Sequence, residues 1–283
     1  MYTSIEELVN AINTQTTYKV KRTSTYKDGI IRDAIEVKGE ETWLNPIIYD
    51  PEFMLEFDIT EVVDYLNKCY ADKGIEREEI VKIFDNKYLF LDKVYSEVVN
   101  AERWAGQIEE RKLANIHFLD LVEIYHISYG KGMSTKVTRD MLKRLDISTK
   151  ELLEATQANN WGELRIRTMR EIIAELHPEL AEEIPVDDMI NIITTKDGLW
   201  GARYIFDTHA LDYTCEKLGY DKIIILPSSR HELIVIEYNE DAKIDELYSM
   251  VKQVNSTQVS EEDFLSNMIY VYQKGSDDLN YLR

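Results

Sequence analysis

One short polar stretch gathers nucleophile, base and acid side chains. It reads PSSRHE at residues 227–232 and offers Ser228, Ser229, His231 and Glu232. A serine hydrolase needs a serine oxygen within hydrogen-bond reach of an imidazole, and a third group that orients the ring. The sequence has no GxSxG motif, and on an extended strand side chains 231 and 232 point to opposite faces. We therefore expect these residues to satisfy backbone groups of a turn, and we keep a catalytic site as the alternative.

A second candidate is an anion site in KDGLWGA, residues 196–202. Gly198 and Gly201 lie where a helix is expected to begin, and the free N–H groups of a helix start can hold an anion. The spacing matches neither a phosphate-binding loop nor a dinucleotide fingerprint. We expect Gly201 to let the helix approach the sheet closely, with a small-ligand or anion site at the two glycines as the alternative.

Metal and disulfide chemistry have little support in the sequence. The five histidines show no HExxH or HxH spacing, and His126 falls in an apolar run, which is typical of a hydrogen-bonded core histidine. The two cysteines, Cys69 and Cys215, lie far apart in apolar patterns. We predict no metal and no cofactor, and we interpret the cysteines as small buried hydrophobic residues in a reducing compartment.

The net charge of the chain bears on the class of its partner. The 283 residues carry 53 acidic and 33 basic side chains, for a formal net charge of −20. Such a surface repels nucleic acid and anionic membranes and attracts basic proteins. Residues 151–188 hold ten acids and residues 237–263 hold eight. A solvated helical face is the ordinary interpretation of both stretches, and a surface that imitates a phosphate backbone is the alternative.

The N-terminal residues and the hydropathy predict a cytoplasmic protein. The sequence begins MYTSIEELVNAI, with acids where a secretory signal has bases. No stretch approaches the roughly 18 apolar residues that a membrane span needs. We expect no association with a membrane and no direct binding to nucleic acid.

The elements that must position these residues are strands and helices in mixed order. The most apolar runs, residues 223–226 and 233–236, flank the polar stretch and predict a central hairpin covered on both faces. Asp28-Gly29 predicts a turn between strands at 16–23 and 30–37. Helical spacing predicts helices at 89–99, 163–177 and 199–218.

The pattern as a whole indicates an α+β fold, with a mixed or antiparallel sheet and packed helices. We expect two subdomains that divide near residue 110. Residues 1–110 would hold a hairpin plus helices, residues 111–275 would hold the central hairpin, and residues 276–283 would form a frayed tail.

Several stretches carry a resemblance to a known family: LPSSRHE at 226–232, KDGLWGA at 196–202, WLNPIIYD at 43–50, DLVEIY at 120–125, and the series from Tyr248 to Tyr272. The chain resembles an uncharacterised bacterial domain family with an LPSSxHE motif, which is common on mobile elements of Gram-positive anaerobes. The family has no established activity, so the resemblance does not say whether the shared residues are structural or functional. Arg230 stands where the family more often has an apolar residue, which implies a more exposed turn. The shared positions are Asn45, Pro46, Gly198, Gly201, Ala202, Pro227, Ser228, Ser229, His231, Glu232 and Asn255.

Three functional hypotheses remain open from the sequence. The first is a non-catalytic, acidic interaction protein of a mobile element or phage, which binds a basic or nucleic-acid-binding host protein and so counters a host defence system. The alternative is a hydrolase-type enzyme that uses His231 with Ser228, Ser229 or Glu232. The third is a sensor of a small ligand or anion at Gly198 and Gly201. The sequence predicts no oligomeric state.

Overall fold

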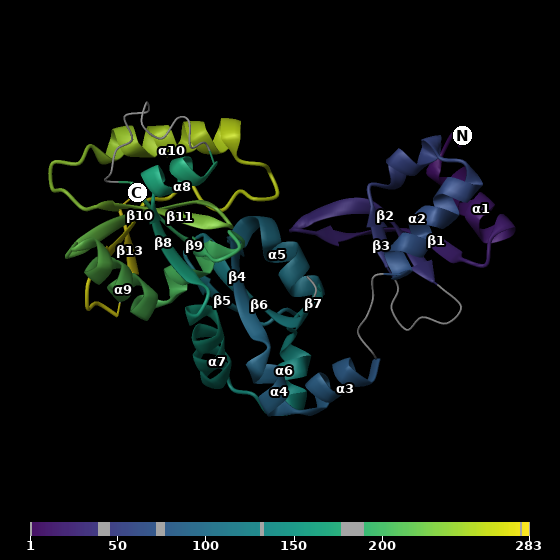
Figure 1. Cartoon of the computed structure of the whole chain (residues 1–283), viewed down its shortest axis with the longest axis horizontal. Helices are drawn as coiled ribbons and strands as arrows, with labels where there is room; N and C mark the ends of the chain where they lie inside the picture. The colour runs from purple at the N-terminus through teal and green to yellow at the C-terminus, as the bar shows by residue number, and fades with distance from the viewer. Residues whose placement is uncertain are drawn as a thin grey trace. The chain divides into compact units, whose positions relative to one another are not determined.

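The computed structural model describes residues 2–38, 46–71, 77–130, 133–176, 190–277 and 279–282. Helices and strands are mixed along the chain (Figure 1), and every strand pair within these ranges is antiparallel. The α+β expectation is confirmed. The chain divides into two compact units, Met1–Ile83 and Phe84–Arg283, and α3 (Arg77–Asp85) crosses the boundary.

The first unit is a three-stranded sheet with helices packed on it. The expected hairpin turns at Asp28 and Gly29, both of which have positive φ angles that a tight hairpin turn requires. Apolar residues from helices and strands, among them Leu8, Ile35 and Leu66, form its core. Its elements are α1 (Ile5–Gln15), β1 (Lys19–Lys27), β2 (Ile30–Lys38), β3 (Ile47–Tyr49), η1 (Pro51–Glu56) and α2 (Ile59–Ala71).

The larger sheet of the second unit has six strands in the order β13-β12-β10-β11-β9-β8. Its two central strands, β10 and β11, are the hairpin that the apolar runs predicted. Ile223 and Ile225 pack into the core on one face, whereas Ile224 and Leu226 pack against α10 on the other. The strands are β8 (Leu164–Thr168), β9 (Asn191–Thr195), β10 (Lys222–Ser229), β11 (Glu232–Glu237), β12 (Tyr270–Gln273) and β13 (Leu279–Tyr281).

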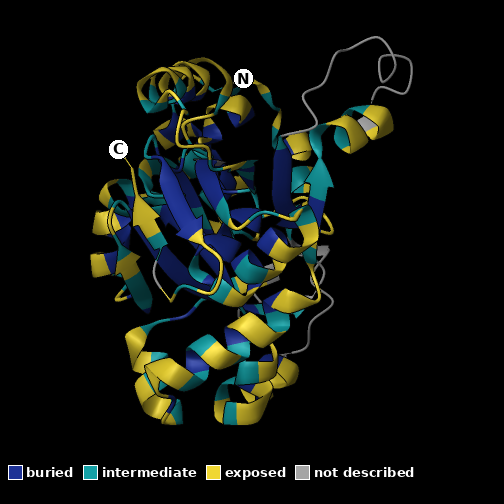
Figure 2. Ribbon diagram, turned by 90° about the vertical axis from the view of Figure 1, so that its left-hand side faces the viewer, coloured by how far each residue is buried: buried dark blue, intermediate teal, exposed yellow. Residues whose placement is uncertain are grey.

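The smaller sheet of the second unit is built around β6, which pairs with β4, β5 and β7. Its strands are β4 (Val94–Asn100), β5 (Asn115–Phe118), β6 (Leu121–Gly130) and β7 (Met133–Lys136). Val98 of β4 and Leu121 of β6 belong to the same buried cluster as Ile225 and Leu233, so the two sheets share one core. Figure 2 shows the buried strands of this core in dark blue.

Helices of the second unit cover both sheets. Figure 1 shows α10 over one face of the six-stranded sheet and α9 over the other. The helices are α4 (Lys87–Asp92), α5 (Ala101–Glu110), α6 (Arg139–Leu145), α7 (Thr149–Trp161), α8 (Met169–Leu176), η2 (Gly201–Phe206), α9 (Thr208–Leu218) and α10 (Ile244–Gln258).

Three of the predicted helices are wrong in part. Residues 94–100 form β4, because all seven pair with β6, and Ser96 and Glu97 are buried in this sheet. Residues 164–168 form the edge strand β8. The helix expected at 199–218 is interrupted at Asp207, whose side chain caps α9 by accepting a hydrogen bond from Ala210 N.

The limits of the expected subdomains also differ from the structure. Residue 110 falls within the second unit, because β4 before it pairs with β6 after it, and the chain divides between Ile83 and Phe84 instead. The tail that was expected to fray contains β13, which pairs with β12. Cys215 is buried and Cys69 is partly buried, and both are free thiols. No helix in the described ranges is long and apolar enough to cross a membrane.

Candidate functional site

Residues 227–232 lie at the turn between the two central strands of the six-stranded sheet, and we call this segment the elbow. Backbone hydrogen bonds hold it from both sides. Gly201 N donates to His231 O at 2.9 Å, and Ala202 N donates to Arg230 O at 3.3 Å. From the opposite side, Arg230 N donates to Asp263 O at 3.0 Å. The elbow is therefore a fixed part of the unit and not a free loop.

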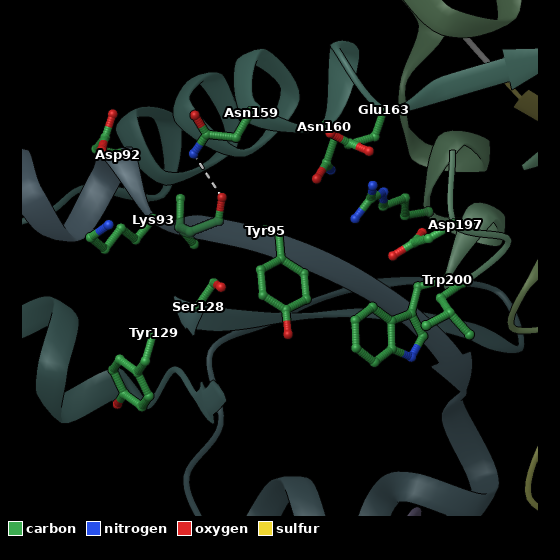
Figure 3. A pocket seen from close by; sticks show the side chains of 13 residues that line it. Asp92, Lys93, Tyr95, Ser128, Tyr129, Asn159, Asn160, Glu163, Asp197 and Trp200 are labelled. Carbon is green, nitrogen blue, oxygen red and sulfur yellow. Dashed lines mark hydrogen bonds between the residues drawn. The ribbon is translucent and has the colours of Figure 1, made fainter. Parts of the chain in front are cut away.

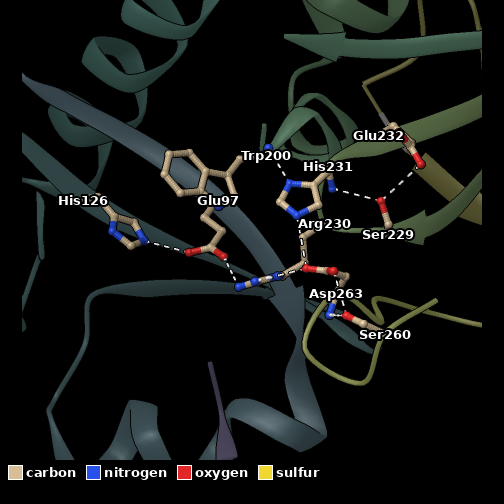
Figure 4. Close-up of polar contacts among 9 residues, drawn as sticks. All are labelled: Glu97, His126, Trp200, Ser229, Arg230, His231, Glu232, Ser260 and Asp263. Atoms are coloured by element: carbon tan, nitrogen blue, oxygen red, sulfur yellow. Dashed lines mark hydrogen bonds and ion pairs between the residues drawn. The ribbon is translucent and has the colours of Figure 1, made fainter. Parts of the chain in front are cut away.

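Both ring nitrogens of His231 have partners inside the protein (Figure 4). Trp200 N donates to Nδ1 at 3.2 Å, and Nε2 lies 3.1 Å from Asp263 Oδ1. A ring nitrogen that accepts a hydrogen bond carries no hydrogen, so Nε2–H is the donor of the hydrogen bond to Asp263 Oδ1. Burial favours the neutral form of Asp263, but a hydrogen bond from Ser260 and the contacts with His231 and Arg230 outweigh it and lower the pKa of this carboxyl.

Arg230 continues these contacts into the smaller sheet. Its Nη1 lies 2.6 Å from Glu97 Oε1 on β4, and its Nη2 lies 3.4 Å from Asp263 Oδ1. Glu97 Oε2 in turn lies 2.9 Å from His126 Nε2 on β6. We call these five residues, His231, Asp263, Arg230, Glu97 and His126, the ion network.

The ion network is largely buried. Arg230, Glu97 and His126 expose 7%, 3% and 4% of their surfaces. The prediction that Arg230 makes the turn more exposed is therefore wrong. Burial by itself would raise the pKa of Glu97, but the hydrogen bond with His126 and the nearby charges, Arg230 among them, lower it below its usual range. His126 is the hydrogen-bonded core residue that its apolar surroundings predicted.

The side chain of Ser229 does not meet the imidazole of His231. Ser229 Oγ accepts a hydrogen bond from the backbone N–H of His231 at 3.1 Å and lies 3.4 Å from Glu232 Oε1. Ser229, His231 and Glu232 are thus neighbours, but both imidazole nitrogens are directed to other groups. The side chain of Ser228 lies outside the described part of the chain.

The glycines serve packing and backbone geometry. Each backbone N–H from residue 198 to residue 202 donates to an acceptor within the protein, so none of them is left for an anion. A Cβ at Gly201 would lie 2.5 Å from His231 O and 2.5 Å from Thr194 Cα, so only glycine lets η2 approach the elbow this closely. Gly198 has open space around it and a φ of +74°.

A cleft of about 630 Å³ lies beside the ion network. Its lining comes from β4, β6, the end of α7 and the segment between β9 and η2, and it includes Tyr95, Glu163, Asp197 and Trp200 (Figure 3). The Tyr95 ring stacks on His126 with 5.2 Å between centroids, and on Trp200 with 5.5 Å. One wall of the cleft is therefore in direct contact with the ion network.

Residues 2–274 match the model of a family of unknown function, DUF5688. The chain belongs to this family. The resemblance to an uncharacterised family, inferred from the sequence, is thereby confirmed. Among curated proteins and among solved structures, no significant match exists. Membership in DUF5688 therefore assigns no activity to the site.

Sequence reasoning missed most of the charged residues at the centre of this DUF5688 member. Glu97 and Glu123 are single acids within the apolar strands β4 and β6, and a lone acid in such a run is the signal that could have found them. Tyr125 OH donates to Glu123 Oε2 at 2.7 Å, and burial raises the pKa of Glu123 to about 7. Asp263 and Arg203 carry no comparable local signal, because their positions depend on chain segments far apart in the sequence.

Proposed function

We propose that this chain is a non-catalytic binding protein. The main observation behind this proposal is that both ring nitrogens of His231 already have hydrogen-bond partners, Trp200 N–H at Nδ1 and the Asp263 carboxylate at Nε2. A general base must lie within hydrogen-bond reach of the proton that it takes, and Ser229 Oγ has neither nitrogen as a partner. The elbow residues then serve to hold the two sheets of the second unit together, and among the described side chains no observation favours the hydrolase alternative.

The proposed partner is a basic protein. Five exposed acids gather where β11 leads into α10, and we call them the acidic patch: Glu237, Glu240, Asp241, Asp245 and Glu246. The one base within these ten residues, Lys243, pairs with Glu246 at 2.9 Å. The other acid-rich stretch supports the proposal less, since Glu151 pairs with Lys87 and residues 177–188 of it lie outside the described ranges. A cluster of exposed negative charges raises the rate at which a protein associates with a basic surface.

The biological setting of the proposal comes from the resemblance alone. In a cytoplasm that hosts a mobile element or phage, the partner would be a basic or nucleic-acid-binding host protein, and binding it would counter a host defence. The net charge of −20 supports a positively charged, basic partner and opposes direct binding to nucleic acid.

Charge reversal tests the acidic patch. The full chain carrying Glu240→Lys, Asp241→Lys and Asp245→Lys is compared with wild type in capture from host lysate, at low and high salt, with mass spectrometry of the captured proteins. A variant with Glu52→Lys, Glu56→Lys and Asp64→Lys makes the same change in net charge on exposed residues of the first unit and is the matched control.

We expect wild type and the control to capture the same basic protein, and the patch variant to lose it. Added salt should weaken the capture, because it screens exposed charges. If the amount of captured protein changes neither with salt nor in the patch variant, the acidity serves solubility only. Tight binding of the purified chain to DNA or RNA would also contradict the proposal.

A further inference from the structure

The charges in the lining of the cleft are unequally buried. Three carboxylates, Asp92, Glu163 and Asp197, are on exposed residues, and so is Lys93. Arg203 also lines the cleft, but only 7% of its surface is exposed. The cleft therefore has a mostly acidic rim and one deeply buried guanidinium.

Arg203 lacks the ion pair that a buried arginine normally has. Among the described residues, no carboxylate oxygen lies within 4.0 Å of its guanidinium, and its buried Nε has no hydrogen-bond partner. Arg230, which is buried to the same degree, has both Glu97 and Asp263 as partners. Burying an unpaired charge is costly, so an unpaired arginine at a cleft indicates an anionic group supplied from outside.

The neighbours of Arg203 bring two of the rim carboxylates, Glu163 and Asp197, close to it. Its guanidinium lies over the Tyr204 ring, 5.4 Å from the centroid, and Tyr204 OH donates to Asn160 O at 2.9 Å. Glu163 N donates to the same carbonyl at 3.0 Å, so Glu163 lies at this side. A hydrogen bond from Thr195 and the charge of Arg203 are among the causes that lower the pKa of Asp197, so this carboxylate also lies near Arg203.

We propose that the cleft binds a zwitterionic small molecule of the amino-acid type, with its carboxylate on Arg203 and its ammonium facing Glu163 and Asp197. Guanidinium and carboxylate match in geometry and charge. The acids of the rim attract an ammonium and repel a phosphate, whose several charges one guanidinium does not balance. The Tyr95 and Trp200 rings form an apolar wall for the rest of the molecule, and a volume of about 630 Å³ is ample for it.

The test measures ligand binding by the full chain, and it is independent of the acidic patch. Thermal shift with each of the twenty common L-amino acids selects a probe, and calorimetry then measures its affinity. Acetate and inorganic phosphate are the comparison anions. The variants are Arg203→Gln and Glu163→Gln, and Arg165→Gln, an exposed arginine of β8, is the matched control.

We expect at least one amino acid to bind to wild type and to Arg165→Gln alike. Arg203→Gln should weaken this binding at least tenfold, and Glu163→Gln should weaken it severalfold while it strengthens the binding of acetate. Because Glu163 is exposed, its variant keeps the test valid if Arg203→Gln does not fold. The proposal is overturned if no amino acid binds, if phosphate binds more tightly than any amino acid, or if both variants bind as wild type does.

Discussion

Arg230 and Glu97 form an ion pair with 2.6 Å between Nη1 and Oε1, although 133 residues separate them in the sequence. The pair joins the elbow of the six-stranded sheet to the strand β4 of the smaller sheet. Both partners are almost fully buried, and each has a second partner, Asp263 for Arg230 and His126 for Glu97. The stability of the second unit should therefore depend on this contact.

Arg230→Ala should lower the free energy of unfolding by about 3–5 kcal/mol, because it leaves the Glu97 carboxylate buried without its cation. Urea denaturation measures the change. Arg139→Ala is the control, since its pair with Glu109 is exposed at 3.5 Å and should contribute less than about 1 kcal/mol. Equal effects of the two substitutions would mean that the buried pair does not stabilise the fold.

His231→Ala should lower the free energy of unfolding by about 1–3 kcal/mol, because Trp200 N–H and Asp263 each lose a hydrogen-bond partner. His231→Asn should recover part of this loss by accepting from Trp200 N, and His231→Gln should recover part by donating to Asp263. Chemical denaturation of the three variants measures the effect. A His231→Ala chain as stable as wild type would refute the structural role and favour an enzyme.

Gly201→Ala should lower the melting temperature strongly, since the new methyl group would lie 2.5 Å from backbone atoms of His231 and Thr194, which have little room to move. Gly162→Ala is the matched control. It has a φ of −64° and open space around it, so the melting temperature should stay the same or rise slightly. Similar melting curves for the two variants would show that η2 does not approach the elbow so closely.

Because of Glu123, the free energy of unfolding should fall as the pH rises from about 4.5 to 7. The pKa of Glu123 is about 7 in the folded chain and 4.5 as its ordinary value. Over this range the folded state holds a proton that the unfolded chain has lost, so its contribution to stability is full below pH 4.5 and is lost toward pH 7. The difference of about 2.5 in pKa corresponds to a loss of about 3 kcal/mol. In Glu123→Gln, urea denaturation at pH 5 and pH 8 should show a correspondingly smaller difference, and an unchanged difference would locate the pH dependence elsewhere.

The sequence by itself determined the local elements and the class of the fold. Apolar runs bounded by turn residues predicted the central hairpin of β10 and β11, and Asp28-Gly29 predicted the turn of the N-terminal hairpin. Both signals are local, because hydrophobic periodicity and turn geometry depend on a few consecutive residues. Motif resemblance likewise identified the family, since it needs no contact between distant segments.

Only the tertiary structure decided what the polar residues do. The helix that the spacing predicted at 89–99 is wrong from residue 94 onward, because β4 pairs with β6 along its whole length and buries Glu97 between apolar neighbours. Likewise, no local pattern shows that Arg230 has two carboxylate partners whereas Arg203 has none within 4.0 Å among the described residues. The partner of a buried charge is set by chain segments that meet only after folding, so the sequence alone does not show which buried charges are paired within the protein.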